Sequence, residues 1–392
     1  MFLTHFTMEQ SDCGKISTAA RYSLRMRKGT VMKAVILVGG KATRLLPLTC
    51  NIPKALMPVI NTPFLEHVIR HLSRHQIKEI VLAQGHLAQP IEDYFGGGSR
   101  FGVKIIYVVE DTTLGTAGAV KNAERYLDEP FLVLNGDIIT DLDIMAMIDF
   151  HRERKAKVTI ALTPVDDPTS YGLIETNAGG RITRFLEKPS WDEVTTNMIN
   201  AGTYVLEPEV LARIPPQTNF SFERQLFPLL LDSGEPIYAY SASAYWIDMG
   251  TLEKYLQLHR DLLSGKSGQY APTEDLVIGE QSNIHPTAKI TGSVVIGANC
   301  AIGQGVKLIG PVVIGDGCSI LEDSLIENSV IWRNARLGPR VNLRDSILAD
   351  NCCLNTGSTG EGVVLGDNVT VVGNRKLEPG SKIWLGETVE AT

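Results

Sequence analysis

A six-residue repeat in the last part of the chain is the feature that most restricts its fold. After a linker at 264–273, aliphatic residues recur nine times at intervals of six, at Ile278, Ile284, Ile290, Ile296, Ile302, Leu308, Ile314, Ile320 and Ile326. A hexapeptide period is typical of a parallel β-helix, in which each side of a triangular coil sends one aliphatic side chain inward. Such coils bury a core only by stacking on their neighbours. We therefore expect a β-helix domain over 274–392.

The repeat changes phase towards the C-terminus. It slips by one position to Ile331, Leu337 and Leu343 and resumes at Leu365, Val371, Leu377 and Ile383. We interpret residues 351–362, between these two runs, as a loop-like segment. Cys300 and Cys318 are three hexads apart, so they should lie one above the other on successive coils. The six cysteines have no metal-ligand spacing, which is typical of free thiols in a reducing compartment.

The earlier part of the chain has a different pattern. Short apolar runs at 34–38, 79–83, 104–109 and 131–134 alternate with amphipathic stretches at 64–75, 87–94 and 116–127. This alternation predicts an α/β domain with a mostly parallel sheet flanked by helices, which we expect to cover 32–263. Right-handed crossovers would place the strand C-terminal ends, and any ligand, at one edge of the sheet. We expect residues 1–31 to be a poorly ordered N-terminal extension.

The charge and hydropathy of the chain exclude two classes of partner. The chain has 37 basic and 44 acidic residues, for a net charge of −7, so no surface is built to neutralise a nucleic acid. No apolar run reaches the roughly 20 residues of a membrane span, and the N-terminus lacks the apolar stretch of a secretory signal. We expect a soluble, cytoplasmic protein that binds neither nucleic acid nor membrane.

A glycine turn with nearby cations follows the first apolar run. Gly39 and Gly40 end the run, and Arg44 and Lys54 come shortly after. Backbone N–H groups of glycines can approach an anion closely, and Arg and Lys add charge-assisted donors. The glycine spacing fits neither the dinucleotide fingerprint nor a P-loop. From the two glycines alone, a phosphate site and a tight turn with solvated bases are equally good interpretations.

Two acids far apart in the sequence are candidate metal ligands. Asp137 follows the buried run 131–134, at the sheet edge where a metal ligand belongs, although a helix cap would also explain it. Asp248 lies in an apolar setting beside Trp246. An unpaired buried Asp is costly, so Asp248 needs a cation or hydrogen-bond donors. Mg²⁺ takes few protein carboxylates and shares its shell with phosphate and water, so two acids suffice.

Taken in order, these motifs resemble those of the sugar-1-phosphate nucleotidyltransferase family. The family's glycine loop with Thr-Arg-Leu, its Pro-Leu-Thr segment and its Pro-Lys pair are all present, but Ala42 stands where the family usually has glycine. The resemblance covers about 32–255. It implies a Rossmann-like mixed sheet followed by a left-handed β-helix, and transfer of a nucleotidyl group from a nucleoside triphosphate to a hexose-1-phosphate with Mg²⁺ as cofactor.

The resemblance also implies a role for individual residues. Catalysis is assigned to Arg44, Lys54, Asp137 and Lys188, and Mg²⁺ binding to Asp137 with Asp248. The expected nucleotide-binding residues are Gly39, Gly40, Thr43, Gln84, Gly115, Thr116 and Gly118. The expected sugar-binding residues are Tyr171, Gly172, Glu187 and Asn200. For Gln84, an exposed polar residue at a strand end is an equally good interpretation.

Several functions remain open from the sequence. The motifs are most similar to the mannose-1-phosphate guanylyltransferase branch of the family, with glucose-1-phosphate thymidylyl-, uridylyl- and adenylyltransferases as alternatives. A regulatory paralogue that binds a nucleotide-sugar without making it is a second class, although all five charged site residues are present. Many hexapeptide-repeat domains are acyltransferases, but His285 is the only histidine in the repeat region and lies near its start. We expect the β-helix to mediate homo-oligomerisation or regulation.

Overall fold

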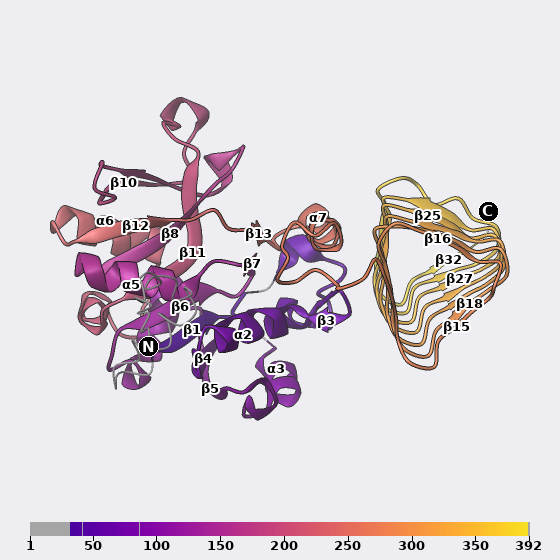
Figure 1. The fold of residues 1–392 in the computed structure, drawn as a ribbon, viewed down its shortest axis with the longest axis horizontal. Helices are drawn as coiled ribbons and strands as arrows, with labels where there is room; N and C mark the ends of the chain where they lie inside the picture. The colour runs from indigo at the N-terminus through magenta and orange to yellow at the C-terminus, as the bar shows by residue number, and fades with distance from the viewer. Residues whose placement is uncertain (1–31, 41, 86, 391–392) are drawn as a thin grey trace, which may run out of the picture. The chain divides into compact units, whose positions relative to one another are not determined.

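The computed structural model describes residues 32–40, 42–85 and 87–390. Within these ranges the predicted fold class is confirmed: a mixed, mostly parallel sheet with helices is followed by the all-parallel sheets of the predicted β-helix (Figure 1). The extension expected at 1–31 lies outside the described residues. None of the described helices is long and apolar enough to span a membrane.

The first sheet is built around four parallel strands. They are β1 (Lys33–Leu37), β4 (Glu79–Gln84), β5 (Lys104–Val109) and β6 (Phe131–Asn135), in the spatial order β6-β1-β4-β5. Each lies within one residue of a predicted run. The sheet continues beyond β6 through β11 (Met198–Leu206), β8 (Val158–Pro164), β12 (Ile237–Ser241), β9 (Gly172–Thr176) and β10 (Ile182–Glu187). Because β1, β4, β5 and β6 are parallel, their C-terminal ends share one edge.

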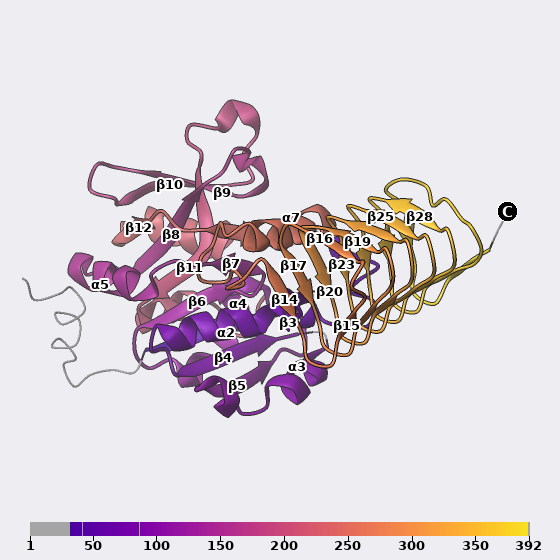
Figure 2. The ribbon, with the colours of Figure 1, turned by 45° about the vertical axis from the view of Figure 1, so that its right-hand side comes forward.

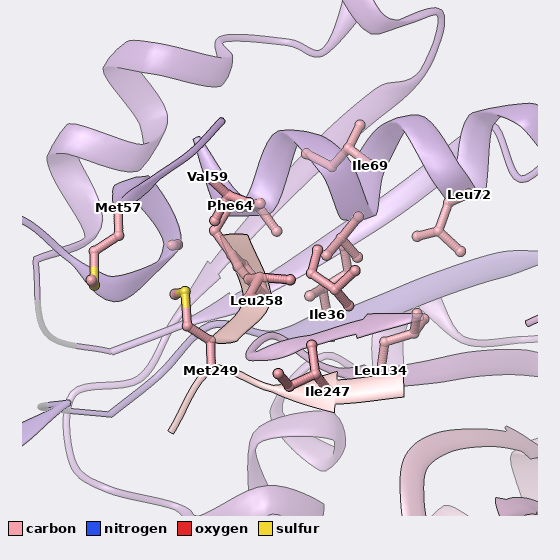
Figure 3. Close-up of a cluster of buried hydrophobic side chains, with 14 of the residues drawn as sticks. Ile36, Met57, Val59, Phe64, Ile69, Leu72, Leu134, Ile247, Met249 and Leu258 are labelled. Carbon is pink, nitrogen blue, oxygen red and sulfur yellow. The ribbon is translucent and has the colours of Figure 1, made fainter. Parts of the chain in front are cut away.

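Helices bury both faces of this sheet. In β1, Ala34 and Ile36 belong to one hydrophobic cluster and Val35 to the other, as the alternation of side chains along a strand requires. The first cluster includes residues of α2 (Phe64–Arg74), α3 (Ala88–Phe95), α5 (Ile144–Arg154) and α7 (Leu252–Leu263). The second includes residues of α4 (Gly115–Asn122) and α6 (Phe227–Asp232). Figure 3 shows part of the first cluster, where side chains from α2, β1 and β6 meet.

The remaining short elements connect these units. The stretch expected as one helix at 116–127 is α4 followed by a 3₁₀ turn, η4 (Glu124–Tyr126). Two hairpin strands are β2 (Pro58–Val59) and β3 (Thr62–Pro63), and a separate two-stranded ribbon is formed by β7 (Ile138–Thr140) and β13 (Trp246–Asp248). The other short turns of helix are η1 (Thr43–Leu45), η2 (Lys54–Leu56), η3 (Ser99–Phe101), η5 (Pro168–Ser170), η6 (Trp191–Glu193), η7 (Pro208–Arg213) and η8 (Phe222–Leu226).

The C-terminal domain consists of three parallel sheets whose strands stack coil on coil (Figure 2). The first sheet contains β14 (Leu276–Ile278), β17 (Val294–Ile296), β20 (Val312–Ile314), β23 (Val330–Ile331), β26 (Ile347–Leu348), β29 (Val364–Leu365) and β31 (Lys382–Ile383). The second contains β15 (Asn283–Ile284), β18 (Ala301–Ile302), β21 (Ser319–Ile320), β24 (Arg336–Leu337), β27 (Cys353–Leu354), β30 (Thr370–Val371) and β32 (Thr388–Val389). The third contains β16 (Lys289–Thr291), β19 (Lys307–Ile309), β22 (Leu325–Glu327), β25 (Asn342–Arg344) and β28 (Thr359–Glu361).

The prediction of a loop-like segment at 351–362 is wrong. The strands β27 and β28 occupy this segment. β27 pairs in register with β24 and β30 on either side, and β28 pairs in register with β25. The inward position of β28 is held by Gly360, whose space is filled by the side chains of Val363 and Leu343. A glycine at an inward position removes the aliphatic signal from the sequence without interrupting the coil.

The stacking predicted for the cysteines is confirmed. Ala301 N–H donates to the carbonyl of Cys318, so Cys300 and Cys318 occupy equivalent places on successive coils. Both side chains are buried in the β-helix core, and the five cysteines in the described part of the chain are free thiols.

Candidate active site

A cavity of about 380 Å³ opens at the sheet edge where β1 and β6 end. Its walls come from segments that are distant in the sequence. They are 37–40 and 42–45 at the end of β1, 53–55 around η2, 135–137 at the end of β6, and the single residues Thr116 and Gly250. The glycine turn, Arg44, Lys54 and Asp137 therefore face one cavity.

The glycine turn has an unusual backbone. Gly40 has a φ of 113°, which strongly favours glycine, and Ala42 has φ 46° and ψ 38°, in the left-handed region. Ala42 thus adopts a conformation that glycine accepts more readily than alanine, and its carbonyl accepts a hydrogen bond of 3.0 Å from the Thr49 hydroxyl. The turn leads directly into η1, which exposes Arg44 at the cavity.

Asp137 and Asp248 are carried by the ribbon of β7 and β13. The two strands are antiparallel with Asp248 opposite Ile138, and the N–H of Met249 donates to the carbonyl of Asp137 over 2.8 Å. Ile247 and Met249 point into the hydrophobic cluster (Figure 3), so the alternation along the strand turns Asp248 to the other side. Two acids 111 positions apart in the sequence are therefore backbone neighbours.

The Oδ2 atom of each carboxylate accepts hydrogen bonds from neighbouring side chains. Asp137 Oδ2 accepts from Lys54 Nζ at 2.9 Å. Asp248 Oδ2 accepts from the Tyr171 hydroxyl at 2.5 Å and from Lys254. Burial, and then the bond to Asp248, raise the pKa of Tyr171, so the phenol stays a donor at neutral pH.

The donor set fits a magnesium ion. Asp137 lines the cavity, Asp248 lies next to it across the ribbon, and each carboxylate contacts a lysine through its Oδ2. No group of three or more His, Cys, Asp or Glu side chains suited to a metal occurs in the described ranges. A metal here would therefore take only Asp137 and Asp248 from the protein and complete its shell with phosphate and water, which Mg²⁺ prefers.

Gly250 brings Arg44 next to the same ribbon. A Cβ atom on Gly250 would lie 2.5 Å from Asp248 Oδ1 and 3.4 Å from Arg44 Nη2. The absence of a side chain at this position lets the guanidinium and the carboxylate approach from two sides of the chain. Arg44, Lys54 and Asp137 thus line the cavity, and Asp248 lies beside them at Gly250.

Of the residues expected at the nucleotide base, Thr116 lines the cavity, whereas Gly115, Gly118 and Gln84 do not. Thr116 lines the cavity, and its hydroxyl donates to Glu223 over 3.0 Å. A Cβ on Gly115 would lie 2.8 Å from the carbonyl of Phe220, and one on Gly118 2.5 Å from the carbonyl of Thr218. These glycines permit close packing of α4 against 218–220 and do not line the cavity. Gln84 is fully buried and donates to Glu92 of α3 over 3.2 Å, also away from the cavity.

Glu110 lies beside Gly39 of the glycine turn, and the sequence analysis did not predict a role for it. Its Oε1 would be 3.5 Å from a Cβ on Gly39 and 3.1 Å from one on Gly85. Its Oε2 accepts the N–H of Leu114 at 3.2 Å, which fixes the carboxylate at the start of α4. Burial raises the pKa of Glu110 above its ordinary value. The only sequence signal was an acid directly after a predicted strand, as for Asp137.

The residues expected at the sugar lie together on β9, β10 and β11. Glu187 pairs with Gly172 across two antiparallel strands, and its Oε2 would be 3.1 Å from a Cβ on Gly172. The N–H of Lys188 donates to the carbonyl of Tyr171 over 2.8 Å, although the Lys188 side chain is exposed and does not line the cavity. Asn200 Nδ2 donates to the Tyr204 hydroxyl over 2.8 Å, and its Oδ1 accepts the N–H of Gly202 at 2.9 Å.

Glu223 was also missed by the sequence analysis. It accepts from Thr116, from Ser221 at 2.7 Å and from the Tyr204 hydroxyl at 3.2 Å. Burial, and then the negative charge of Glu223, raise the pKa of Glu187, which places the two acids near each other. Glu223 follows a segment without regular structure, so no periodicity pointed to it.

The comparisons with known proteins agree with this geometry. The sequence model of the nucleotidyl transferase family matches residues 33–265. The chain belongs to this family. A second model, that of the GMPPB C-terminal domain, matches residues 273–380 of the nucleotidyl transferase.

Individual relatives extend over most of the chain. A UTP–glucose-1-phosphate uridylyltransferase of Synechocystis sp. is 37% identical over 344 residues, which are 83% of this nucleotidyl transferase and 89% of the relative. A mannose-1-phosphate guanyltransferase of Candida albicans is 38% identical over 353 residues, 87% of this chain and 92% of the relative. The crystal structure of HddC from Yersinia pseudotuberculosis, complexed with GMP-PN, aligns with a TM-score of 0.51 and 30% identity, covering 58% of this chain and 97% of that one.

Proposed function

We propose that this nucleotidyl transferase joins GTP to mannose-1-phosphate, with Mg²⁺, to give GDP-mannose and pyrophosphate. The observation that carries the proposal is the cavity itself, because a glycine turn, Arg44, Lys54 and Asp137 line it, and the ribbon places Asp248 next to Asp137. A relative named as a mannose-1-phosphate guanyltransferase, aligned over nearly its whole length, supports this substrate pair. The five charged residues expected in the site, Arg44, Lys54, Asp137, Lys188 and Asp248, are all present, which argues against a regulatory paralogue without activity.

The reaction we propose is a single in-line displacement. A phosphate oxygen of mannose-1-phosphate attacks the α-phosphorus of GTP, and the bond from that phosphorus to the bridging oxygen of the β-phosphate breaks as the new bond forms. Pyrophosphate leaves, and no enzyme nucleophile is required. Transfer of this kind depends mainly on positioning and on stabilisation of charge, which side chains arranged in advance can supply.

The charged side chains divide this work. Mg²⁺ held by Asp137 and Asp248 would neutralise phosphate charge when bound. Arg44 lies at the exposed end of the glycine turn and would stabilise the charge that builds on the leaving pyrophosphate. Lys54 and Lys188 would bring the two mutually repelling anions together. Tyr171 and Glu187 would bind sugar hydroxyls, and the backbone N–H groups of Gly39 and Gly40 would bind the triphosphate.

The choice of base rests on Glu110. Guanine presents two adjacent donors on its pairing edge, N1–H and the N2 amino group, and a carboxylate can accept both. Adenine has no N1–H, and uracil or thymine has a single N3–H beside acceptor oxygens, so neither matches two acceptors. With Oε2 bonded to Leu114 and Oε1 directed between Gly39 and Gly85, the carboxylate is fixed in place. It therefore favours GTP over the other nucleotides.

A substrate matrix tests this proposal. Pyrophosphate release is measured with ATP, CTP, GTP, UTP and dTTP, each with glucose-, mannose- and N-acetylglucosamine-1-phosphate. We expect GTP with mannose-1-phosphate to give the highest kcat/KM. The second candidate is UTP with glucose-1-phosphate, which the Synechocystis relative favours. Release with none of the fifteen pairs would contradict the whole proposal.

The variant Glu110→Gln tests the base contact separately. An amide offers one acceptor and one donor, which match N3–H and O4 of uracil or thymine. We expect GTP turnover to fall about 10- to 100-fold and UTP or dTTP turnover to rise, since a bidentate base contact contributes about 1–3 kcal/mol. Glu124→Gln, an exposed acid paired with Lys121, makes the same chemical change away from the glycine turn and serves as control. An unchanged nucleotide preference in Glu110→Gln would refute the role of Glu110.

We also propose that residues 32–263 form the catalytic domain and 274–392 the β-helix domain, and that the protein assembles as a homo-oligomer through the β-helix. Light scattering on the purified full chain measures its mass in solution, and a monomer at assay concentrations would refute the assembly.

A further inference from the structure

One face of the β-helix is apolar on its outside. In its first sheet (β14, β17, β20, β23, β26, β29 and β31), successive side chains alternate between the β-helix core and the outer surface. The outward column is Val295, Val313, Val330, Ile347 and Val364, and all five are buried. They belong to the same hydrophobic cluster as residues of α7, including Tyr255 and Leu258. Outward positions of the other sheets, such as Lys307 and Arg336, are exposed.

Polar contacts fix α7 to this face at two places. The Nε1–H of Trp332, in the coil that follows β23, donates to the Tyr255 hydroxyl over 2.9 Å, and both side chains are buried. That hydroxyl in turn donates to the carbonyl of Pro58. Further along the helix, Arg260 donates to Asn328 at 2.9 Å and to Asp345 at 2.8 Å. The buried Tyr255 hydroxyl therefore has its donor and acceptor both satisfied only while the β-helix is in place.

A side chain of the same helix also contacts Asp248 of the candidate site. Lys254 is the residue immediately before Tyr255, and its ammonium group contacts Asp248 and the Tyr171 hydroxyl. The helix begins just after the ribbon, and Thr251 caps it by accepting the N–H of Lys254 at 3.3 Å. An α-helix is rigid over one turn, so a shift at Tyr255 moves the stem of Lys254 with it.

We propose that α7 connects the β-helix to the catalytic cavity, with Lys254 as the positioning residue of Asp248 and Trp332 as the β-helix contact that holds Lys254 in place through Tyr255. The β-helix then contributes to catalysis without touching substrate. This role of the β-helix is separate from oligomerisation. The activity measurements below rest on the proposed nucleotidyl transfer, whereas the exchange measurements do not.

The first test compares two tryptophan variants. Trp332→Phe keeps an aromatic ring but removes the Nε1–H donor to Tyr255. Trp384→Phe makes the same change in the last coil, where Trp384 is 46% exposed. Deuterium exchange in the full chain, without metal or substrate, is followed on peptides covering 246–255. We expect faster exchange in Trp332→Phe only, together with a rise of about five-fold in the Mg²⁺ concentration for half-maximal rate and little change in the KM for the sugar phosphate.

A double-mutant cycle separates this route from a general loss of stability. In a Lys254→Met background the connection to Asp248 is already cut, so Trp332→Phe should cause no further loss of rate. The same fold loss in both backgrounds, or no effect in either, would overturn the proposal. If Trp332→Phe fails to fold, Arg260→Gln, which breaks the other anchor of α7, replaces it in the same cycle. Changed exchange without activity in any protein would instead reject the proposed nucleotidyl transfer.

Discussion

The substitution Gly250→Ala offers a direct test of the charged residues at the cavity. The added methyl would lie 2.5 Å from Asp248 Oδ1, whereas ordinary contacts begin near 3.4 Å. The atom it meets is the end of a side chain, and Gly250 does not have a positive φ, so the backbone can accept alanine. The carboxylate must therefore move by about 1 Å, which disturbs its contacts with the Tyr171 hydroxyl and Lys254.

The size of the effect follows from that displacement. A misplacement of about 1 Å in a catalytic group can reduce the rate about 100-fold, which corresponds to about 2.7 kcal/mol of barrier. Stability should not fall, because replacing glycine by alanine at a permitted φ lowers the entropy of the unfolded chain. We expect a large loss of kcat with an unchanged or slightly higher Tm, measured by pyrophosphate release and thermal denaturation.

Gly97→Ala is the matched control for this experiment. A Cβ on Gly97 would meet no atom within 4 Å, its φ is not positive, and it lies far from the cavity lining. We expect wild-type kinetics. Normal turnover of Gly250→Ala at limiting Mg²⁺ would refute the placement of Asp248 in the site. A loss of rate accompanied by a Tm drop of many degrees would show that the variant reports on folding instead.

Three further predictions follow from the structure. Asp137→Asn should reduce turnover by at least about 10³-fold, since it removes a site acid and leaves Lys54 without its partner, and steady-state kinetics measure the loss. Ala42→Gly should raise the free energy of unfolding by about 0.5–1 kcal/mol in urea titrations, because alanine at φ 46° is strained, whereas Ala119→Gly within α4 should lower it. Burial lowers the pKa of His71 and of His259 to about 4, below the ordinary value of 6.5. Since the unfolded state then binds more protons, stability is retained above about pH 6.5 and falls as the pH drops towards 4, by about 2 kcal/mol per histidine at pH 5. Urea unfolding at pH 7 and pH 5 measures this, and equal stability at both would contradict it.

Parts of the site were predictable because they follow strands. Asp137 and the glycine turn come directly after buried apolar runs, and parallel strands place their C-terminal ends at one edge. The prediction of Gln84 as a base contact illustrates the limit of this argument. Gln84 also ends a strand, but its side chain turns towards Glu92 beneath the edge, while Glu110 of the next strand reaches the turn. Which side of a strand end faces the ligand depends on register and packing, which a single run of residues does not record.

Two other residues that the sequence analysis missed, Lys254 and Glu223, were not predictable for a different reason. Lys254 lies on an amphipathic helix, where a lysine is usually a solvated surface residue, and Glu223 follows an irregular segment. Each gains its function from a neighbour more than one element away: Asp248 for Lys254, and Thr116 with Tyr204 for Glu223. No local pattern distinguishes such residues from ordinary charged side chains.

The sequence by itself determined the elements of this protein: the hexad period required a β-helix, and the alternation of apolar runs with amphipathic stretches required a parallel sheet open at one edge. These are local periodicities, set by the repeat geometry of strands and helices. Only the tertiary structure decided that the ribbon of β7 and β13 makes neighbours of Asp137 and Asp248, and that the outward valines of the β-helix cover α7. Those contacts join segments that are distant in the sequence. They are fixed by which apolar faces bury each other, and that choice is made by the folded chain as a whole.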